Sequence, residues 1–115
     1  APNLMPMPSI DRNALYRVDV YHDPGAGRIE AHVPVDVAGC VDDARQRKFF
    51  SPLTVTVDGQ AINIVVEIKG AQSLAAAILM WPETMATAAR SVVEQVRGQR
   101  VREMILSAGN QIKPN

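Results

Sequence analysis

Aromatic side chains are scarce in this sequence, at 4% of 115 residues. A buried aromatic side chain removes about 150–250 Å² from water, more than Val or Ala can remove. Because hydrophobic residues still make up 47% of the chain, the core has to be built from aliphatic side chains. A small aliphatic core often gains stability from an obligate partner.

Cysteine pairs, excess charge and long apolar runs are also missing. Cys40 is the only cysteine, so no disulfide can form within the chain. Twelve basic and twelve acidic residues cancel, which argues against a strongly basic nucleic-acid-binding domain but permits a local basic patch. No run approaches the roughly 18 apolar residues of a membrane-spanning helix. We therefore expect no membrane partner.

No motif for catalysis, a metal or a cofactor stands out. The glycines of "DPGAGR" fall in a predicted hairpin connection, whereas a phosphate-binding loop lies between a strand and a helix. Strand alternation predicts His22 on an apolar face and His32 on a polar face, so both could not bind one ion. Neither histidine has a spacing to Cys40 that indicates a nucleophile pair. We therefore expect no enzyme, metal site or cofactor.

The length favours a single domain over residues 1–115. Residues 1–12 contain three prolines and lack the features of a signal peptide, so they predict an extended arm. Residues 13–81 predict an antiparallel sheet, residues 82–109 two helices, and residues 110–115 a short tail.

The first predicted hairpin consists of two alternating runs on either side of "HDPGAG". Placing Arg17 opposite Glu30 pairs opposite charges across the strands. The same register places Asp19 opposite Arg28 and brings the two apolar faces together. Those faces consist of Tyr16, Val18 and Val20 on one strand and Ile29, Ala31, Val33 and Val35 on the other.

The second predicted hairpin is "SPLTVTVDGQAINIVVEIKG", in which Asp58-Gly59 fits a two-residue type I′ turn. Val57 then faces Gln60, and every second residue shares a face. The apolar face consists of Leu53, Val55, Val57, Ile62, Ile64, Val66 and Ile68. The more polar face consists of Thr54, Thr56, Ala61, Asn63, Val65, Glu67 and Lys69. Such a polar face is most often simply solvated, and a ligand or nucleic-acid surface is the alternative.

Residues 74–81 follow Ser73 in the segment "SLAAAILMW". They could form either a buried strand or a short helix. Alanine favours a helix, but Pro82 favours an element that ends at Trp81, and we interpret the segment as a strand. Pro82 then begins a helix, and Gly98 indicates its end. A second helix follows. Apolar residues at helical spacing form a stripe on each helix, suited to a core or to a subunit contact.

The segment "DDARQRKFF" combines basic and aromatic residues. Arg45, Arg47 and Lys48 could reach phosphates, and Phe49 and Phe50 could stack on unpaired bases. The alternative is a solvated connection that the two phenylalanines anchor to the core.

The order of these elements resembles the coat proteins of single-stranded RNA bacteriophages. The segments that carry the resemblance are "LTVTVDGQAINIVVEIKG", "AAILMWPETMATAARSVVEQVRGQ" and "RVREMILSAGNQI", within residues 45–112. In that family the helices of one subunit lie across its partner's sheet, and RNA lies against the other face. Dimers with a continuous sheet assemble into a closed icosahedral shell.

The resemblance implies an α+β fold with an antiparallel sheet, an N-terminal hairpin and two C-terminal helices packed on one face, in an intertwined homodimer. It implies a dimer interface at Met85, Ala89, Val92, Val96, Val101 and Ile105. It implies RNA binding by Thr54, Thr56, Asn63 and Lys69, with Arg45, Arg47 and Lys48 nearby.

Two functions follow as hypotheses. The first is a capsid protein that dimerises and self-assembles around single-stranded RNA in a bacterial host's cytoplasm, to be found in the virion. The second is a cytoplasmic dimeric binding module without catalytic activity, which uses the polar sheet face or "RQRKFF" to hold a partner. A small enzyme would need a pocket in which the pKa of His22 is strongly shifted.

Overall fold

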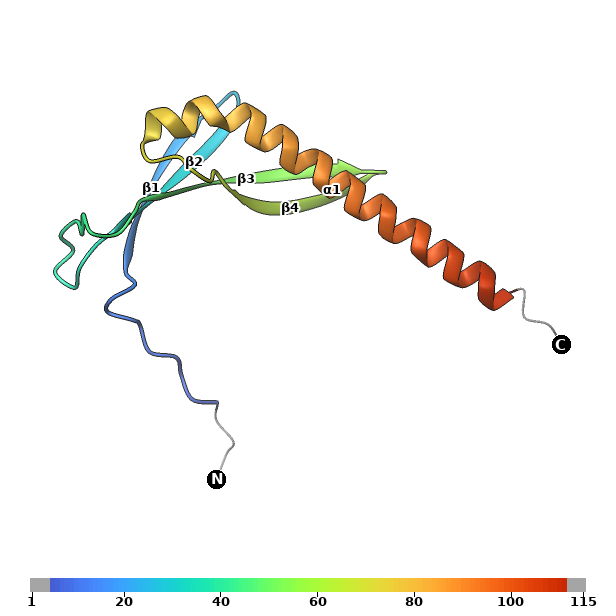
Figure 1. Ribbon diagram of the computed structural model, residues 1–115, viewed down its shortest axis with the longest axis horizontal. Helices are drawn as coiled ribbons and strands as arrows, with labels where there is room; N and C mark the ends of the chain where they lie inside the picture. The colour runs from blue at the N-terminus through green and yellow to red at the C-terminus, as the bar shows by residue number, and fades with distance from the viewer. Residues whose placement is uncertain (1–4, 112–115) are drawn as a thin grey trace.

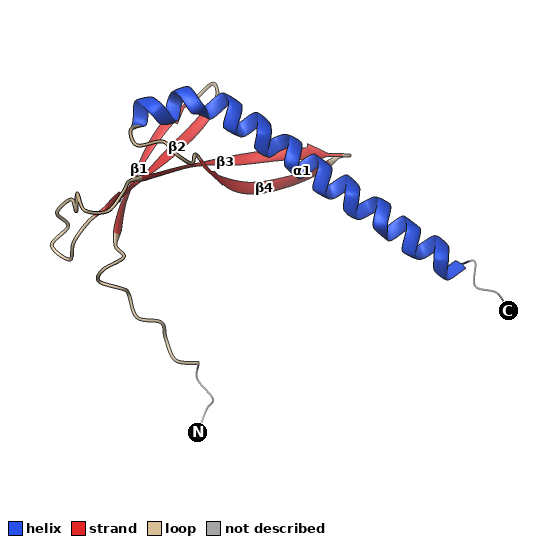
Figure 2. Ribbon diagram, viewed as in Figure 1, coloured by secondary structure: helices blue, strands red, loops and turns tan. Residues whose placement is uncertain are grey.

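One antiparallel sheet and one long helix form the computed structural model, which describes residues 5–111. The four strands lie in the order β1-β2-β3-β4, and the helix covers one face of the sheet (Figures 1 and 2). The elements are β1 (Tyr16–Asp23), β2 (Gly27–Pro34), β3 (Lys48–Val57), β4 (Gln60–Glu67) and α1 (Leu74–Gln111). The chain is therefore α+β, as the sequence predicts.

The second hairpin, β3–β4, has the predicted register. Val57 faces Gln60 and Leu53 faces Ile64. The turn residues Asp58 and Gly59 have φ values of 50° and 82°, as a type I′ turn requires. Aspartate and glycine both tolerate this left-handed backbone, so the turn fixes the register and directs the predicted apolar face toward α1.

The register predicted for the first hairpin, β1–β2, is wrong. Arg17 faces Val33 rather than Glu30, a shift of three residues, and Asp19 faces Ala31. An odd shift turns every side chain of β1 to the opposite face. The charges pair along the strands instead, with Arg17 Nε 3.1 Å from Asp19 Oδ1.

The turn of the first hairpin explains this register. Asp23 faces Gly27 across the end of the ladder, and its carboxylate accepts a hydrogen bond of 2.8 Å from the backbone N–H of Gly25. Its backbone carbonyl also accepts a hydrogen bond from the N–H of Ala26. The connection therefore needs three residues, and turn geometry outweighs cross-strand pairs worth about 0.2–1 kcal/mol each.

Two predictions for the C-terminal third are also wrong. Residues 74–81 are helical rather than a strand, and α1 continues through Pro82 and Gly98 instead of forming two helices. The helix also includes residues 110 and 111, which were predicted to lie in the tail. Residues 112–115 of that tail lie outside the described range.

The start of α1 explains why residues 74–81 are helical. Ser73 acts as the N-cap, because its hydroxyl accepts a hydrogen bond of 3.2 Å from the N–H of Ala76. The alanines that follow have the highest helix propensity. Pro82 is exposed, so its ring does not disturb the packed side of the helix. Gly98 costs about 1 kcal/mol relative to alanine in a helix. This cost is too small to end a helix that has helical turns before and after the glycine.

The core lies between α1 and the covered face of the sheet. It consists of Ile29, Ala31, Phe49, Ile68, Ala71, Ala77 and Met85. Ser51 is fully buried beside this core. Its hydroxyl donates to the carbonyl of Arg28 at 2.8 Å and accepts from Nε1 of Trp81 at 2.9 Å. These two bonds tie β2, β3 and α1 together and satisfy the Ser51 hydroxyl and the Trp81 indole N–H.

The helix crosses the sheet and continues past it (Figure 1). Trp81 lies against β2, where a β-carbon on Gly27 would be 3.4 Å from its ring. Further along, Arg100 forms an ion pair with Asp58 in the β3–β4 turn. Residues 101–111 follow with no strand beneath them, and at 1.5 Å per residue they span about 16 Å.

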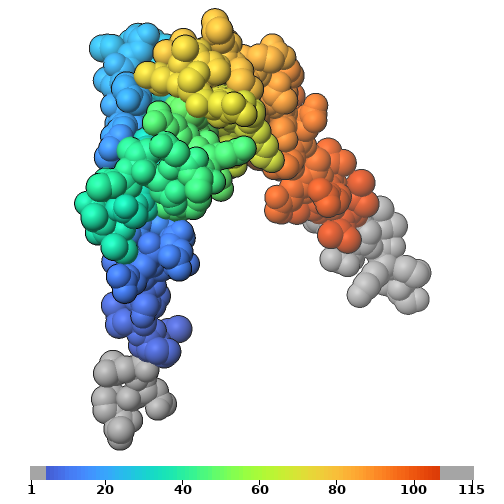
Figure 3. Space-filling view, turned by 60° about the vertical axis from the view of Figure 1, so that its left-hand side comes forward, coloured from blue at the N-terminus to red at the C-terminus, as the bar shows by residue number. Residues whose placement is uncertain are grey.

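The chain is more open than a compact domain. Its radius of gyration is 20.8 Å, against about 13 Å for a compact domain of similar length. The arm, residues 5–12, contains no helix or strand. In Figure 3 the arm and the end of α1 project from the body as two separate limbs. Neither limb finds a partner within the described part of the chain.

Candidate functional site

The sheet face opposite α1, here the open face, carries several predicted RNA-contact residues. Thr54 pairs with Asn63 across β3 and β4, and their side chains form a hydrogen bond of 2.7 Å. Thr56 lies on the same face, and all three are exposed. Lys69 is also exposed but lies in the turn after β4. The strands therefore bring Thr54, Thr56 and Asn63 together and leave Lys69 apart.

An aromatic row, Tyr16, His32 and Phe50, crosses three strands of the open face. The ring centroids of Tyr16 and His32 are 6.2 Å apart, and those of His32 and Phe50 are 4.5 Å apart. The row could not be predicted from the expected register of β1, because that register placed Tyr16 on the other face. The available signal was the pair Phe49-Phe50, since adjacent residues in a strand point to opposite faces.

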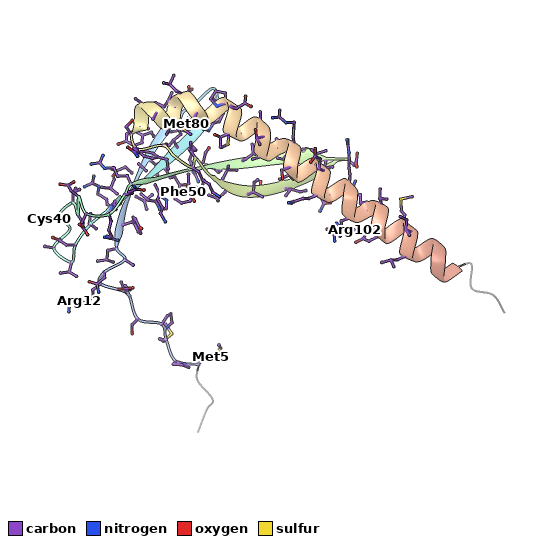
Figure 4. The ribbon with its side chains drawn as sticks, viewed as in Figure 1. Met5, Arg12, Cys40, Phe50, Met80 and Arg102 are labelled. Atoms are coloured by element: carbon purple, nitrogen blue, oxygen red, sulfur yellow. The ribbon has the colours of Figure 1, made fainter. Side chains whose placement is uncertain are left out.

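The two phenylalanines accordingly have different surroundings. Phe49 is 2% exposed and lies in the core under α1, whereas Phe50 is half-buried on the open face (Figure 4). They begin β3 rather than a free connection. Lys48 faces His32 across β2 and β3, so a cation stands beside the aromatic row. Arg47 precedes the strand and is exposed.

Arg45, also predicted to contact RNA, is engaged within the chain. Its Nη2 donates to the carbonyls of Leu15 and Val35, both at 2.8 Å. Its Nε donates to Oδ2 of Asp42 at 3.0 Å, and its guanidinium lies 5.1 Å from the centre of the Tyr16 ring. Arg45 thus fastens the loop between β2 and β3 to the start of β1 and positions the end of the aromatic row.

Protonation of Asp42 is expected to loosen this loop. The hydrogen bonds from the Arg45 side chain and from the Ala44 N–H lower the pKa of Asp42. A carboxyl with a lowered folded-state pKa stabilises the fold above its unfolded pKa, about 3.9, and loses that contribution as pH falls through the folded value. We expect wild type to exceed Asp42→Asn in melting temperature at neutral pH, with the difference shrinking as pH falls below about 4 and through the lowered folded-state pKa. A difference that is independent of pH would contradict this role.

The predicted dimer-interface residues divide into two groups along α1. Met85 is 5% exposed and belongs to the chain's own core, while Ala89, Val92 and Val96 are half-buried against the sheet. The second group, Val101 and Ile105, is 54% and 64% exposed. Together with Met104, which is 70% exposed, these residues form the outer stripe. The outer stripe is therefore apolar and uncovered within the described chain, on the part of α1 that carries Arg102 in Figure 4.

The two edges of the sheet differ in character. β4, "QAINIVVE", carries one charged side chain and no proline. β1 carries Arg17, Asp19 and Asp23. Natural proteins protect a long apolar edge with charge, proline or a covering element, and within the described residues β4 has only the charge of Glu67 at its end. Its side toward the helix is also incompletely covered, because Ile62 and Ile64 remain half-buried.

The two histidines lie on one face of the sheet, so the prediction that they lie on opposite faces is wrong. Because His32 faces Val18 and His22 faces Arg28 across the β1–β2 ladder, both point to the open face. Over the described residues, no group of three or more His, Cys, Asp or Glu side chains gathers as a metal site would require. Nor is any described helix both apolar and long enough to cross a bilayer.

Comparisons of this chain with protein-family models, with curated proteins and with solved structures gave no match. Three surfaces of the described chain bear on function: the open face with its aromatic row, the outer stripe of α1, and the edge of β4.

Proposed function

We propose that this protein is a coat-type structural subunit that dimerises and assembles into a shell around single-stranded RNA. The observation that carries the proposal is the outer stripe, an apolar surface beyond the chain's own sheet, where Val101 and Ile105 are 54% and 64% exposed. A monomer would leave this surface in water, whereas a second copy would bury it. Such a subunit would be located in the virion.

The edge of β4 supports a dimer with a continuous sheet. Two β4 strands paired antiparallel about a two-fold axis would satisfy each other's free backbone groups. Four strands about 4.8 Å apart form a sheet that is wider than one helix of about 10 Å diameter can cover. Ile62 and Ile64 are half-buried beside α1, so they offer apolar surface to the helix end of a partner.

The open face supports contact with RNA. Lys48 supplies a charge for phosphates, the exposed hydroxyls and amide of Thr54, Thr56 and Asn63 supply hydrogen bonds, and the aromatic row suits stacking on unpaired bases. The formal net charge of zero does not oppose this role, because weak contacts from many subunits add along one RNA chain.

Size-exclusion chromatography with light scattering, read at 260 and 280 nm, tests the proposal on freshly expressed protein. A shell around RNA gives a particle of very large mass with a nucleic-acid-like absorbance ratio. A discrete dimer with a protein-like ratio, at every salt concentration, would contradict packaging and favour the dimeric binding module. A monomer would contradict both.

Lys48→Gln is expected to weaken RNA binding without affecting the fold, because Lys48 is exposed at the start of β3. Removal of one phosphate contact on a single strand lowers the slope of log affinity against log salt by about 0.7. The measurement is titration of a fluorescent single-stranded oligonucleotide into disassembled protein at several salt concentrations. Arg90→Gln is the matched control, since Arg90 is exposed on the helix. Equal slopes for Lys48→Gln and wild type would remove Lys48 from the interface.

A further inference from the structure

A pocket of about 250 Å³ lies between the β1–β2 turn and the first turns of α1. The chain contains one Trp and two Tyr, and this pocket is lined by Trp81 and Tyr21 together with Ile29, Leu74 and Ile78. The Nε1 of Trp81 is already bonded to Ser51, so the ring is held in place. The pocket is thus a preformed apolar site with two aromatic walls.

The walls of this pocket remain open to solvent. Ile78 is 55% exposed and Tyr21 is 45% exposed. Asp23 also lines the pocket, whereas the guanidinium of Arg28 pairs with Glu30 at 3.5 Å. The apolar floor therefore has a negative charge beside it. An occupant that matches this site needs apolar side chains, little conformational entropy to lose, and a positive charge close by.

The arm has this chemistry. Its side chains Met5, Met7 and Ile10 are 88%, 87% and 80% exposed. Pro6 and Pro8 restrict the backbone to extended conformations, and proline-rich extended segments bind in aromatic-lined grooves. The exposed apolar side chains of the arm therefore match the chemistry of the pocket.

Charge complementarity supports the same pairing. Arg12 closely follows the apolar part of the arm, and the carboxylate of Asp23 lies at the pocket. Seating Ile10 in the pocket would place Arg12 near Asp23. An ion pair of this kind fixes the register of a docked segment more than it adds affinity.

The arm points away from the pocket of its own chain. Its attachment is fixed at Leu15, whose carbonyl accepts hydrogen bonds from Val35 N and Arg45 Nη2. Leu15 precedes β1, and the pocket lies at the opposite end of that strand, beside Asp23. Figures 1 and 3 show the arm leaving the body of the molecule.

We propose that the arm of one copy docks in this pocket of a neighbouring copy, with Met and Ile side chains against Trp81 and Tyr21. The partner is a second copy of this chain, so the inference rests on the proposed self-association. The contact uses neither the outer stripe nor the edge of β4. It would therefore join one dimer to the next.

Disulfide trapping between copies tests the contact. Two chains carry Cys40→Ser, one with Met7→Cys and the other with Ala26→Cys at the pocket, and they are co-expressed and exposed to oxidised glutathione. We expect a disulfide between the two chains by mass spectrometry. Ile78→Lys in the second chain should lower its yield about tenfold or more, since a charge enters the apolar site. As the control, Ala44→Cys in an exposed loop replaces Ala26→Cys. This pair of chains should give no disulfide above background.

The outcomes separate this inference from the proposed function. A third variant carries both Met7→Cys and Ala26→Cys in one chain. If its disulfide forms only within the chain, docking between copies is overturned. Large particles on light scattering without the trapped disulfide would also overturn it while leaving self-assembly intact. A monomer without the disulfide would overturn both.

Discussion

Phe49→Ala is expected to lower the free energy of unfolding by about 3–5 kcal/mol. Phe49 is 2% exposed and is among the largest side chains that the chain buries fully. It packs with Ile68 and Met85 between β3 and α1. In a chain with so few aromatics, no neighbour can fill the space, so the cavity term adds to the lost transfer free energy. A domain is stable by only about 5–15 kcal/mol, so the loss is a large fraction of the total.

Phe50→Ala is the matched control, because it removes the same side chain one residue away. Phe50 is half-buried on the open face and packs against the tilted ring of His32, so we expect a clearly smaller loss, about 1–2 kcal/mol. Urea unfolding followed by circular dichroism measures both. Equal losses for the two variants would contradict the assignment of Phe49 to the core and Phe50 to the surface.

The sequence predicts the β3–β4 hairpin well because its determinants are local. Asp58-Gly59 selects a type I′ turn, and a two-residue turn leaves no freedom in register. The first hairpin lacked such a signal. "HDPGAG" permits connections of several lengths, and the hydrogen bond from Gly25 N–H to Asp23 Oδ1 decides among them. This single error hid the aromatic row and misplaced His22.

The helix was misread for a different physical reason. Proline in a helix interior costs about 3 kcal/mol, because it lacks an N–H and its ring clashes with the carbonyl four residues back. Here the turns on both sides of Pro82 are helical and Pro82 is exposed, so packing of the neighbouring turns on the sheet outweighs this cost. Gly98 likewise ends a helix only when the backbone there turns left-handed; it remains helical here. The roles of Arg45 and Asp42 were also inaccessible to pattern reasoning, since Arg45 bonds to Leu15, thirty residues away in sequence.

Val101→Glu combined with Ile105→Glu is expected to abolish self-association while sparing the fold. Both residues are exposed, at 54% and 64%, and exposed substitutions change stability by only about 0.5 kcal/mol. In a dimer that buries the outer stripe, each copy would bring two unpaired charges into an apolar contact. A cost of about 3 kcal/mol or more per copy corresponds to association weakened by more than about 100-fold.

Gln95→Glu combined with Gln99→Glu is the matched control for this pair. It adds the same charge at the same four-residue spacing on exposed positions of α1, but on another side of the helix from the outer stripe. Light scattering across a dilution series measures association, and circular dichroism measures helix content. Gln99→Glu also removes a hydrogen bond of 3.5 Å from Gln99 Nε2 to Glu103 on the helix surface, and circular dichroism shows whether helix content changes. Equal association of the two double variants would show that α1 projects into solvent without a partner. Selective loss in Val101→Glu/Ile105→Glu would show that the outer stripe is a subunit contact, and that the open shape of the single chain reflects a fold completed by a second copy.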